Sequence, residues 1–111
     1  MDSMFFPEQL QIMLCAEPVD MRKGFNSLEG MVRDFMNEEP LSGALFVFYG
    51  RRRNSVKVFY WHKDGFAIWS KRLQAGVFRF PKRATADGTS VQISRQALRM
   101  LLEGLELGIA A

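Results

Sequence analysis

The chain has 111 residues, of which 48% are hydrophobic and 24% are charged. These values are typical of one globular domain and exclude disordered, collagen-like and low-complexity proteins. The longest apolar run, residues 44–49, is far shorter than the roughly twenty residues that span a bilayer. The single cysteine, Cys15, is typical of a reducing cytosol. We therefore expect one domain over residues 1–111, loosely ordered at 1–9 and 108–111, in a cytoplasmic protein without a membrane partner.

Charge is divided unevenly along the chain. Residues 1–50 hold three basic and eight acidic side chains, a net charge of −5, whereas residues 51–99 hold twelve basic and two acidic side chains, a net charge of +10. A basic block of this kind suggests a polyanionic partner such as DNA. The alternative is a solvated face whose charges are partly matched by the acidic half of the same fold.

The first half of the sequence predicts a strand, a helix and a second strand. Residues 10–15 alternate and then become continuously apolar, which indicates a strand. Asp20 is placed to cap a helix, and apolar residues at helical spacing over 25–36 predict that helix. Residues 44–49 form a continuous apolar run, as expected for a strand that is covered on both faces.

The second half predicts consecutive strands. Residues 56–61 alternate, Asp64-Gly65 is a strong hairpin signal, and a strand over 66–73 follows it. Residues 77–80 predict another strand, which Pro81 ends.

The last segment predicts a short strand and a helix. Val91 and Ile93 indicate the strand, and Ser94 is placed to cap a helix with an apolar stripe. Because tight turns join antiparallel strands, we predict an α+β fold. It is a single domain with an antiparallel meander sheet of about four to five strands, packed with a helix from the N-terminal half and a C-terminal helix. We expect one shared core, formed by Phe25, Leu28, Val32, Phe35, Val47, Val58, Ile68, Leu98, Leu101 and Leu102.

The acidic side chains form no recognisable catalytic set. A metal-dependent nuclease needs two or three carboxylates on one surface, whereas Asp20, Asp64 and Asp87 are each typical of a cap or a turn. His62 lies beside a hairpin turn, without the sequence of a nucleophile elbow. We predict that the protein is not an enzyme and has no catalytic residue, metal site or cofactor. A metal-dependent nuclease is the less favoured alternative.

Basic and aromatic side chains are interleaved through the second half. Basic groups neutralise phosphates and exposed rings stack on unpaired bases. We nevertheless expect five or more of the seven interleaved rings to be buried in the core: Phe59, Tyr60, Trp61, Phe66, Trp69, Phe78 and Phe80. No zinc-finger, RNP-like or helix-turn-helix motif is present, so the pattern favours contact with phosphates over base readout. The candidate binding residues are Arg51, Arg52, Arg53, Lys57, Lys71, Arg72, Lys82 and Arg83. Arg51, Arg52 and Arg53 occupy one turn, where they must be solvated or matched.

Five segments in fixed order carry a resemblance to one family. They are Val19-Asp20-Met21-Arg22-Lys23-Gly24-Phe25, Phe46-Val47-Phe48 with Arg51-Arg52-Arg53, Tyr60-Trp61-His62-Lys63-Asp64-Gly65-Phe66, Lys71-Arg72-Leu73-Gln74-Ala75-Gly76-Val77-Phe78 and Leu101-Leu102-Glu103-Gly104-Leu105. Together they resemble the accessory protein (TnpB) encoded by the second reading frame of the sixty-six-type bacterial insertion sequences. The resemblance covers residues 10–107 and adds Arg22 and Lys23 to the candidate binding residues.

The resemblance implies a non-enzymatic accessory factor in DNA transposition, acting beside a separate transposase. Its expected partners are DNA, the transposase and other proteins that the element encodes, and a homo-oligomer is a further possibility. The leading hypothesis is that a basic face binds the DNA backbone, the transposase, or both. The alternative is a pure protein-interaction subunit without direct DNA contact.

Overall fold

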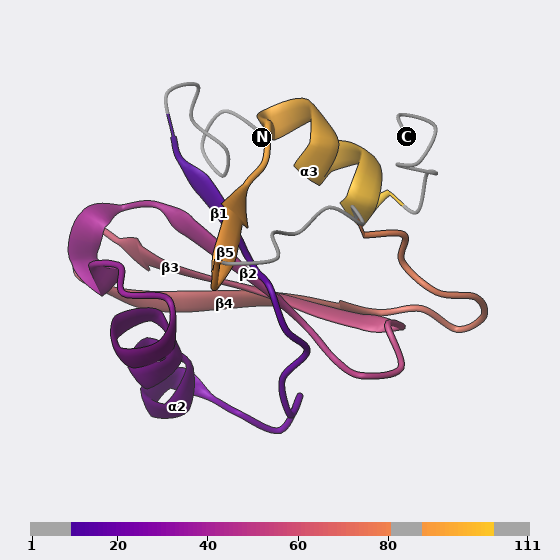
Figure 1. Ribbon diagram of the computed structural model, residues 1–111, viewed down its shortest axis with the longest axis horizontal. Helices are drawn as coiled ribbons and strands as arrows, with labels where there is room; N and C mark the ends of the chain where they lie inside the picture. The colour runs from indigo at the N-terminus through magenta and orange to yellow at the C-terminus, as the bar shows by residue number, and fades with distance from the viewer. Residues whose placement is uncertain (1–9, 81–87, 104–111) are drawn as a thin grey trace.

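The computed structural model describes residues 10–80 and 88–103. A five-stranded sheet lies at its centre, with the strand order β4-β3-β2-β1-β5. Helix α2 lies on one side of the sheet and helix α3 on the other (Figure 1). This arrangement confirms the predicted α+β class. The elements are β1 (Ile12–Cys15), α2 (Phe25–Gly30), η1 (Met31–Phe35), η2 (Pro40–Ser42), β2 (Leu45–Tyr49), β3 (Ser55–His62), β4 (Gly65–Arg72), β5 (Ser90–Gln92) and α3 (Arg95–Leu102).

The sheet is mostly antiparallel. Strands β2, β3 and β4 form the predicted meander, in which Tyr49 lies opposite Val56 and Ser55 opposite Arg72. Strand β1 instead pairs in parallel with β2, and β5 pairs with the other side of β1 in antiparallel. The parallel pair follows from the connection, because the chain crosses from β1 to β2 through α2 and not through a tight turn.

One predicted strand is wrong. Residues 77–80 have no strand partner, and the backbone N–H of Phe78 donates a single hydrogen bond to the carbonyl of Arg53 at 2.7 Å. The side chain of Phe78 is buried against the sheet, so this segment is held by its ring and not by a ladder. The short strand expected at Val91 and Ile93 is present as β5.

The first helix differs from its prediction at both ends. Its N-cap is Gly24, without a side-chain hydrogen bond, so the expected cap by Asp20 is wrong. At Met31 the helix continues as the π-helical turn η1, which the N–H of Met36 closes by donating to the carbonyl of Met31 at 2.9 Å. Leu28, Val32 and Met36 still face the sheet and are buried.

The C-terminal helix begins as predicted. The Ser94 hydroxyl accepts a hydrogen bond from the N–H of Ala97 at 2.9 Å, as an N-cap does. Its apolar stripe is buried at Leu98, Leu101 and Leu102.

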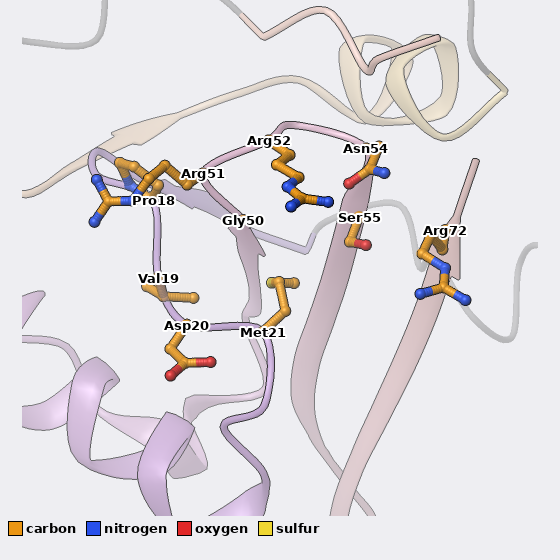
Figure 2. A pocket seen from close by; sticks show the side chains of 10 residues that line it. All are labelled: Pro18, Val19, Asp20, Met21, Gly50, Arg51, Arg52, Asn54, Ser55 and Arg72. Carbon is orange, nitrogen blue, oxygen red and sulfur yellow. The ribbon is translucent and has the colours of Figure 1, made fainter. Parts of the chain in front are cut away.

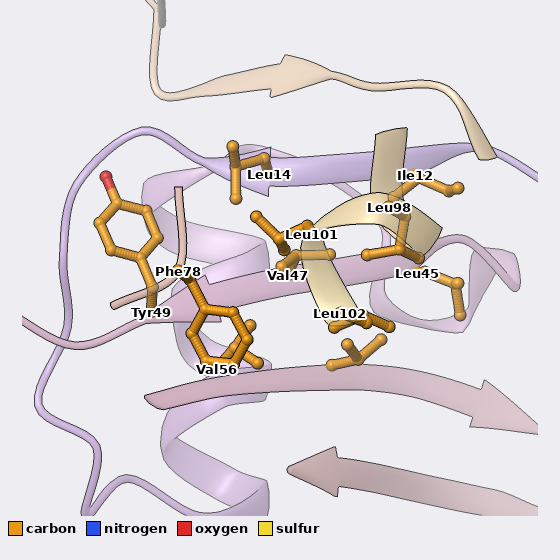
Figure 3. Close-up of a cluster of buried hydrophobic side chains, with 11 residues drawn as sticks. Ile12, Leu14, Leu45, Val47, Tyr49, Val56, Phe78, Leu98, Leu101 and Leu102 are labelled. Carbon is orange, nitrogen blue, oxygen red and sulfur yellow. The ribbon is translucent and has the colours of Figure 1, made fainter. Parts of the chain in front are cut away.

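The prediction of a single shared core is wrong, because the apolar side chains form two clusters. Neighbouring residues of a strand point to opposite faces, and the central strands are covered on both. The cluster under α3 comprises Ile12, Leu14, Leu45, Val47, Tyr49, Val56, Val58, Phe78, Leu98, Leu101 and Leu102 (Figure 3). The cluster under α2 comprises Cys15, Leu28, Val32, Met36, Ala44, Phe46, Phe48 and Phe59. Of the predicted core residues, Phe25 is 51% exposed, and Phe35 and Ile68 are half-buried.

No helix in residues 10–80 and 88–103 is long and apolar enough to cross a membrane.

The two clusters make a testable prediction about additivity. Ile12→Val trims the cluster under α3 and should cost about 0.5–1.5 kcal/mol, and Val32→Ala trims the cluster under α2 and should cost about 1–3 kcal/mol. Because the sheet separates the two sites, the double variant should lose the sum within about 0.5 kcal/mol. Urea denaturation of the four proteins measures this. A coupling energy well above that value would show that the two faces form one packing unit.

Candidate functional site

One end of the sheet is hollowed where three segments meet. We call this hollow, about 420 Å³ in volume, the arginine cleft (Figure 2). The connection from β1 to α2 lines it on one side, and the turn from β2 to β3 with the end of β4 lines it on the other. The lining residues are Pro18, Val19, Asp20, Met21, Gly50, Arg51, Arg52, Asn54, Ser55 and Arg72.

Strand pairing brings the arginines of two elements to the same end of the sheet. The β2–β3 turn is closed by the Arg53 N–H, which donates to the Gly50 carbonyl at 2.9 Å. The next strand residue, Ser55, pairs with Arg72 at the end of β4. Arg51 and Arg52 of the turn and Arg72 of the strand therefore border one cleft, although about twenty residues separate them in sequence.

The opposite wall is held against β2 by one backbone bond and one close contact. The Val19 N–H donates to the carbonyl of Tyr49 at 2.8 Å. Beside it, Met21 occupies the space that a side chain at position 50 would need: a Cβ on Gly50 would lie 2.6 Å from the Met21 Cγ. A glycine at position 50 is therefore a packing requirement of the cleft.

The acidic group in the cleft lining is already paired. The Asp20 carboxylate accepts hydrogen bonds from the Arg22 side chain, with 2.7 Å between Nη2 and Oδ2, and from the Arg22 backbone N–H at 2.9 Å. These bonds from Arg22 hold the pKa of the Asp20 carboxyl well below its usual range, so the group stays ionised and matched. Arg51, Arg52 and Arg72 are exposed and have no hydrogen-bonded or ion-paired partner among the described residues. The cleft therefore presents three unmatched guanidinium groups.

Arg53 differs from its two neighbours in the turn. Its guanidinium carbon lies 5.2 Å from the centre of the Tyr49 ring and 5.9 Å from that of Phe80. Its backbone is left-handed, with φ of 61°, and Arg53 is not among the residues that line the cleft. The rings of Tyr49 and Phe80 themselves stack at 4.3 Å. Of the three adjacent arginines, two border the cleft and one packs on aromatic rings.

The lysines expected at the site bind other parts of the chain. The Lys57 ammonium donates to the Lys23 carbonyl at 2.8 Å, which ties β3 to the segment before α2. The Lys71 ammonium donates to the Leu102 carbonyl at 2.8 Å, at the C-terminal end of α3 on the other face. Lys82 and Arg83 lie outside the described residues.

Sequence reasoning did not identify the rest of the cleft. Met21, Gly50, Asn54 and Ser55 line it beside the arginines. A signal was present for Gly50, a glycine between a continuous apolar run and three arginines, where a turn with little room is expected.

No three His, Cys, Asp or Glu side chains gather as metal ligands within residues 10–80 and 88–103. Asp20 is bonded to Arg22, Asp64 lies in the β3–β4 turn, and Asp87 falls outside those ranges. The buried thiol of Cys15 has a raised pKa, because burial disfavours its thiolate.

Comparison with known proteins identifies similar sequences. A family model described as IS66 Orf2 like protein matches residues 10–110. Two proteins of Sinorhizobium fredii (strain NBRC 101917 / NGR234) are similar over most of both chains. The uncharacterized protein y4jC is 33% identical over 97 residues, which cover 87% of this chain and 80% of y4jC. The uncharacterized protein y4hO is 34% identical over 99 residues, 89% of this chain and 84% of y4hO. No solved structure matches the chain.

The contact between Gly50 and Met21 can be tested by a double-mutant cycle. Gly50→Ala should destabilise the protein by about 1–3 kcal/mol, because the new Cβ overlaps the Met21 side chain. In a Met21→Ala background the same change should cost much less, because the Cγ is gone. Urea denaturation measures both. An equal cost in the two backgrounds would place the cause in the backbone of the turn.

The different surroundings of the turn arginines predict different effects on stability. Arg53→Ala should cost about 0.5–1 kcal/mol through the lost contacts with Tyr49 and Phe80. Arg51→Ala and Arg52→Ala should stay within about 0.5 kcal/mol of the unmodified protein, because both side chains are exposed and neither has a ring contact among the described residues. Thermal denaturation of the three single variants compares them. Equal losses at all three positions would contradict the packing assigned to Arg53.

Proposed function

The chain belongs to the IS66 Orf2-like family, whose members are accessory proteins of transposition, and we propose that it binds the phosphate backbone of DNA in the arginine cleft. In this role the protein binds DNA electrostatically. A separate transposase carries out the chemistry of strand transfer.

The observation that carries the proposal is the meeting of Arg51, Arg52 and Arg72 in one cleft without matching anions. A guanidinium group is planar, always charged at neutral pH and able to donate two parallel hydrogen bonds to a phosphate. Since Arg22 neutralises Asp20, the acidic group of the lining does not oppose an incoming phosphate. The polar side chains of Asn54 and Ser55 add hydrogen-bonding groups to the same wall.

The chemistry of the cleft supports contact with phosphates and not catalysis. Its lining contains no histidine or cysteine, and its single carboxylate is held by Arg22. The cationic groups lie on a turn and a strand end, which position a protein on the backbone but read no base edge. The proposal therefore assigns to this chain a binding function without sequence recognition of its own.

A second candidate function is contact with the transposase through the outer side of α2 and η1. The Phe25 ring at the start of this helix is 51% exposed. Glu29 is paired with Arg33 at 3.3 Å, whereas Asp34 and Glu39 give the end of this segment and the loop after it an acidic character that would repel DNA. An exposed ring beside acidic groups suits a protein partner better than a polyanion.

The proposed DNA contact is tested by the salt dependence of binding. Fluorescence anisotropy on a labelled duplex across a salt series gives the slope of log K against log salt concentration. The double variant Arg51→Ala/Arg52→Ala should bind more weakly, and its slope should fall by about two, because each lost phosphate contact removes about one unit. A charge-matched control, Arg95→Ala/Arg99→Ala on α3, should keep the slope.

Equal slopes for the cleft variant and the control would place any DNA contact elsewhere. Absence of DNA binding by the unmodified protein, with retained binding to the transposase, would favour the second candidate over the first.

A further inference from the structure

The two edges of the sheet differ in length and character. Strand β5, at one edge, has three residues, whereas β4, at the other, has eight. Residues 65–70 of β4 carry neither a charge nor a proline. Short strands, charges and prolines are the usual features that keep sheet edges from pairing. Within the described residues, β4 pairs only with β3, so its outer row of backbone groups has no ladder partner.

The side chains near this edge are covered incompletely. The prediction that five or more of the seven interleaved aromatic rings are buried is wrong: only Phe59 and Phe78 are buried, and the other five are half-buried. The residues of β4 from Gly65 to Trp69 are all half-buried as well. Phe66 stacks on Phe59 at 4.8 Å, at the margin of the cluster under α2. The sheet is therefore apolar up to an edge that its own helices do not cover fully.

We propose that the outer edge of β4 pairs in antiparallel with β4 of a second copy of this chain, about a two-fold axis at Ile68. The two sheets then become one continuous sheet. This inference shares Arg72 with the DNA contact proposed above, and its tests are made without DNA, so that each proposal can fail separately.

The hydrogen-bond phase of β4 agrees with this register. The Leu73 N–H donates to the Asn54 carbonyl at 2.8 Å, toward β3. Since successive residues of a strand direct their backbone groups to opposite sides, Phe66, Ile68, Ser70 and Arg72 direct theirs outward. With a two-fold axis at Ile68, residues whose backbone N–H and C=O groups point outward face residues of the same kind in the second copy. Ile68 pairs with Ile68 of the second copy, and Phe66 pairs with Ser70.

Charge complementarity selects the second copy as the occupant. With the axis at Ile68, Arg72 at the end of β4 comes beside Asp64 in the β3–β4 turn of the second copy, and the same pair recurs at the other end of the paired strands. Both side chains are exposed, and neither has an ion-paired partner among the described residues. Opposite charges across two strands stabilise the pair, and the uncharged middle carries no repulsion. A guanidinium has five N–H groups, enough for Arg72 to meet a carboxylate and still border the cleft.

A cysteine on the axis provides the first test. Residues of a hydrogen-bonded antiparallel pair have Cα atoms about 5.5 Å apart, which fits a disulfide. Ile68→Cys should therefore form a covalent dimer under mild oxidation. Ser70→Cys is the matched control, because its two copies would lie at least roughly 13 Å apart in this register. Cys15 is buried and is kept in both variants. Non-reducing electrophoresis separates the products.

Charge exchange provides the second test. In sedimentation equilibrium without DNA, Asp64→Arg alone and Arg72→Asp alone should each raise the dimer dissociation constant about tenfold or more, because two attractive pairs become repulsive. The double variant should restore it. Circular dichroism verifies that each variant is folded.

A monomer at all concentrations of the unmodified protein would overturn the proposal. Cross-linking of Ser70→Cys in preference to Ile68→Cys, or a double charge variant no better than the single ones, would overturn the register.

Discussion

Burial of β2 on both faces is the constraint on which the rest of the structure depends. All five residues from Leu45 to Tyr49 are buried, and they alternate between the cluster under α3 and the cluster under α2. Two faces of one strand can be buried only if a layer covers each of them, so the helices must lie on opposite sides. Charged groups are then excluded from β2 itself. The arginines of the adjacent turn begin only after Gly50, directly beyond the end of this strand.

The sequence contained the evidence for two clusters, but the prediction of one core did not use it. A continuous apolar run at 44–49 indicates a strand covered on both faces, and such a strand requires two separate sets of partners. The parallel pairing of β1 was similarly implied by the helix that follows it, because a helical crossover, unlike a tight turn, allows parallel neighbours. Hydrophobic periodicity located most of the elements; it could not assign each helix to a face.

Local chemistry decided the elements that sequence reasoning placed incorrectly. Aspartate is a common N-cap residue, yet the Asp20 carboxylate accepts hydrogen bonds from Arg22, two residues later. The helix starts at Phe25, without a side-chain cap. Residues 77–80 have the composition of a strand, yet they do not pair with the outer edge of β4, and the Phe78 N–H donates to the Arg53 carbonyl in the β2–β3 turn. Phe78 therefore enters the cluster under α3 as a single buried ring. These outcomes depend on which neighbours are available in three dimensions, which no window of sequence contains.

The basic block was recognisable from the sequence, but the different roles within it were not. Lys57 and Lys71 lie in similar sequence surroundings on the neighbouring strands β3 and β4. Their ammonium groups nevertheless donate to carbonyls on opposite faces of the sheet. The reason is register: Lys71 pairs with Val56, so it shares the face of α3, whereas Lys57 points to the side of α2. Arg53 has a left-handed backbone and packs its guanidinium on the rings of Tyr49 and Phe80, which its sequence does not reveal. Net charge thus predicts that a polyanion is a suitable partner. Only the strand pairing identifies which basic side chains have no partner within the described residues.

The proposed pairing of β4 and the arginine cleft are linked through Arg72. A two-fold axis perpendicular to a sheet leaves each face on its own side, so both clefts of the pair would open on the side that carries α2. The two Arg72 residues would lie eight residues apart along the joined strands, roughly 26 Å. On β4 the uncharged residues are 65–70 and the cations are Lys71 and Arg72 at its end, so pairing through residues 66–70 leaves Arg51 and Arg52 of both clefts uncovered. The two proposed phosphate-binding clefts would then open on one side of the joined sheet at a fixed separation.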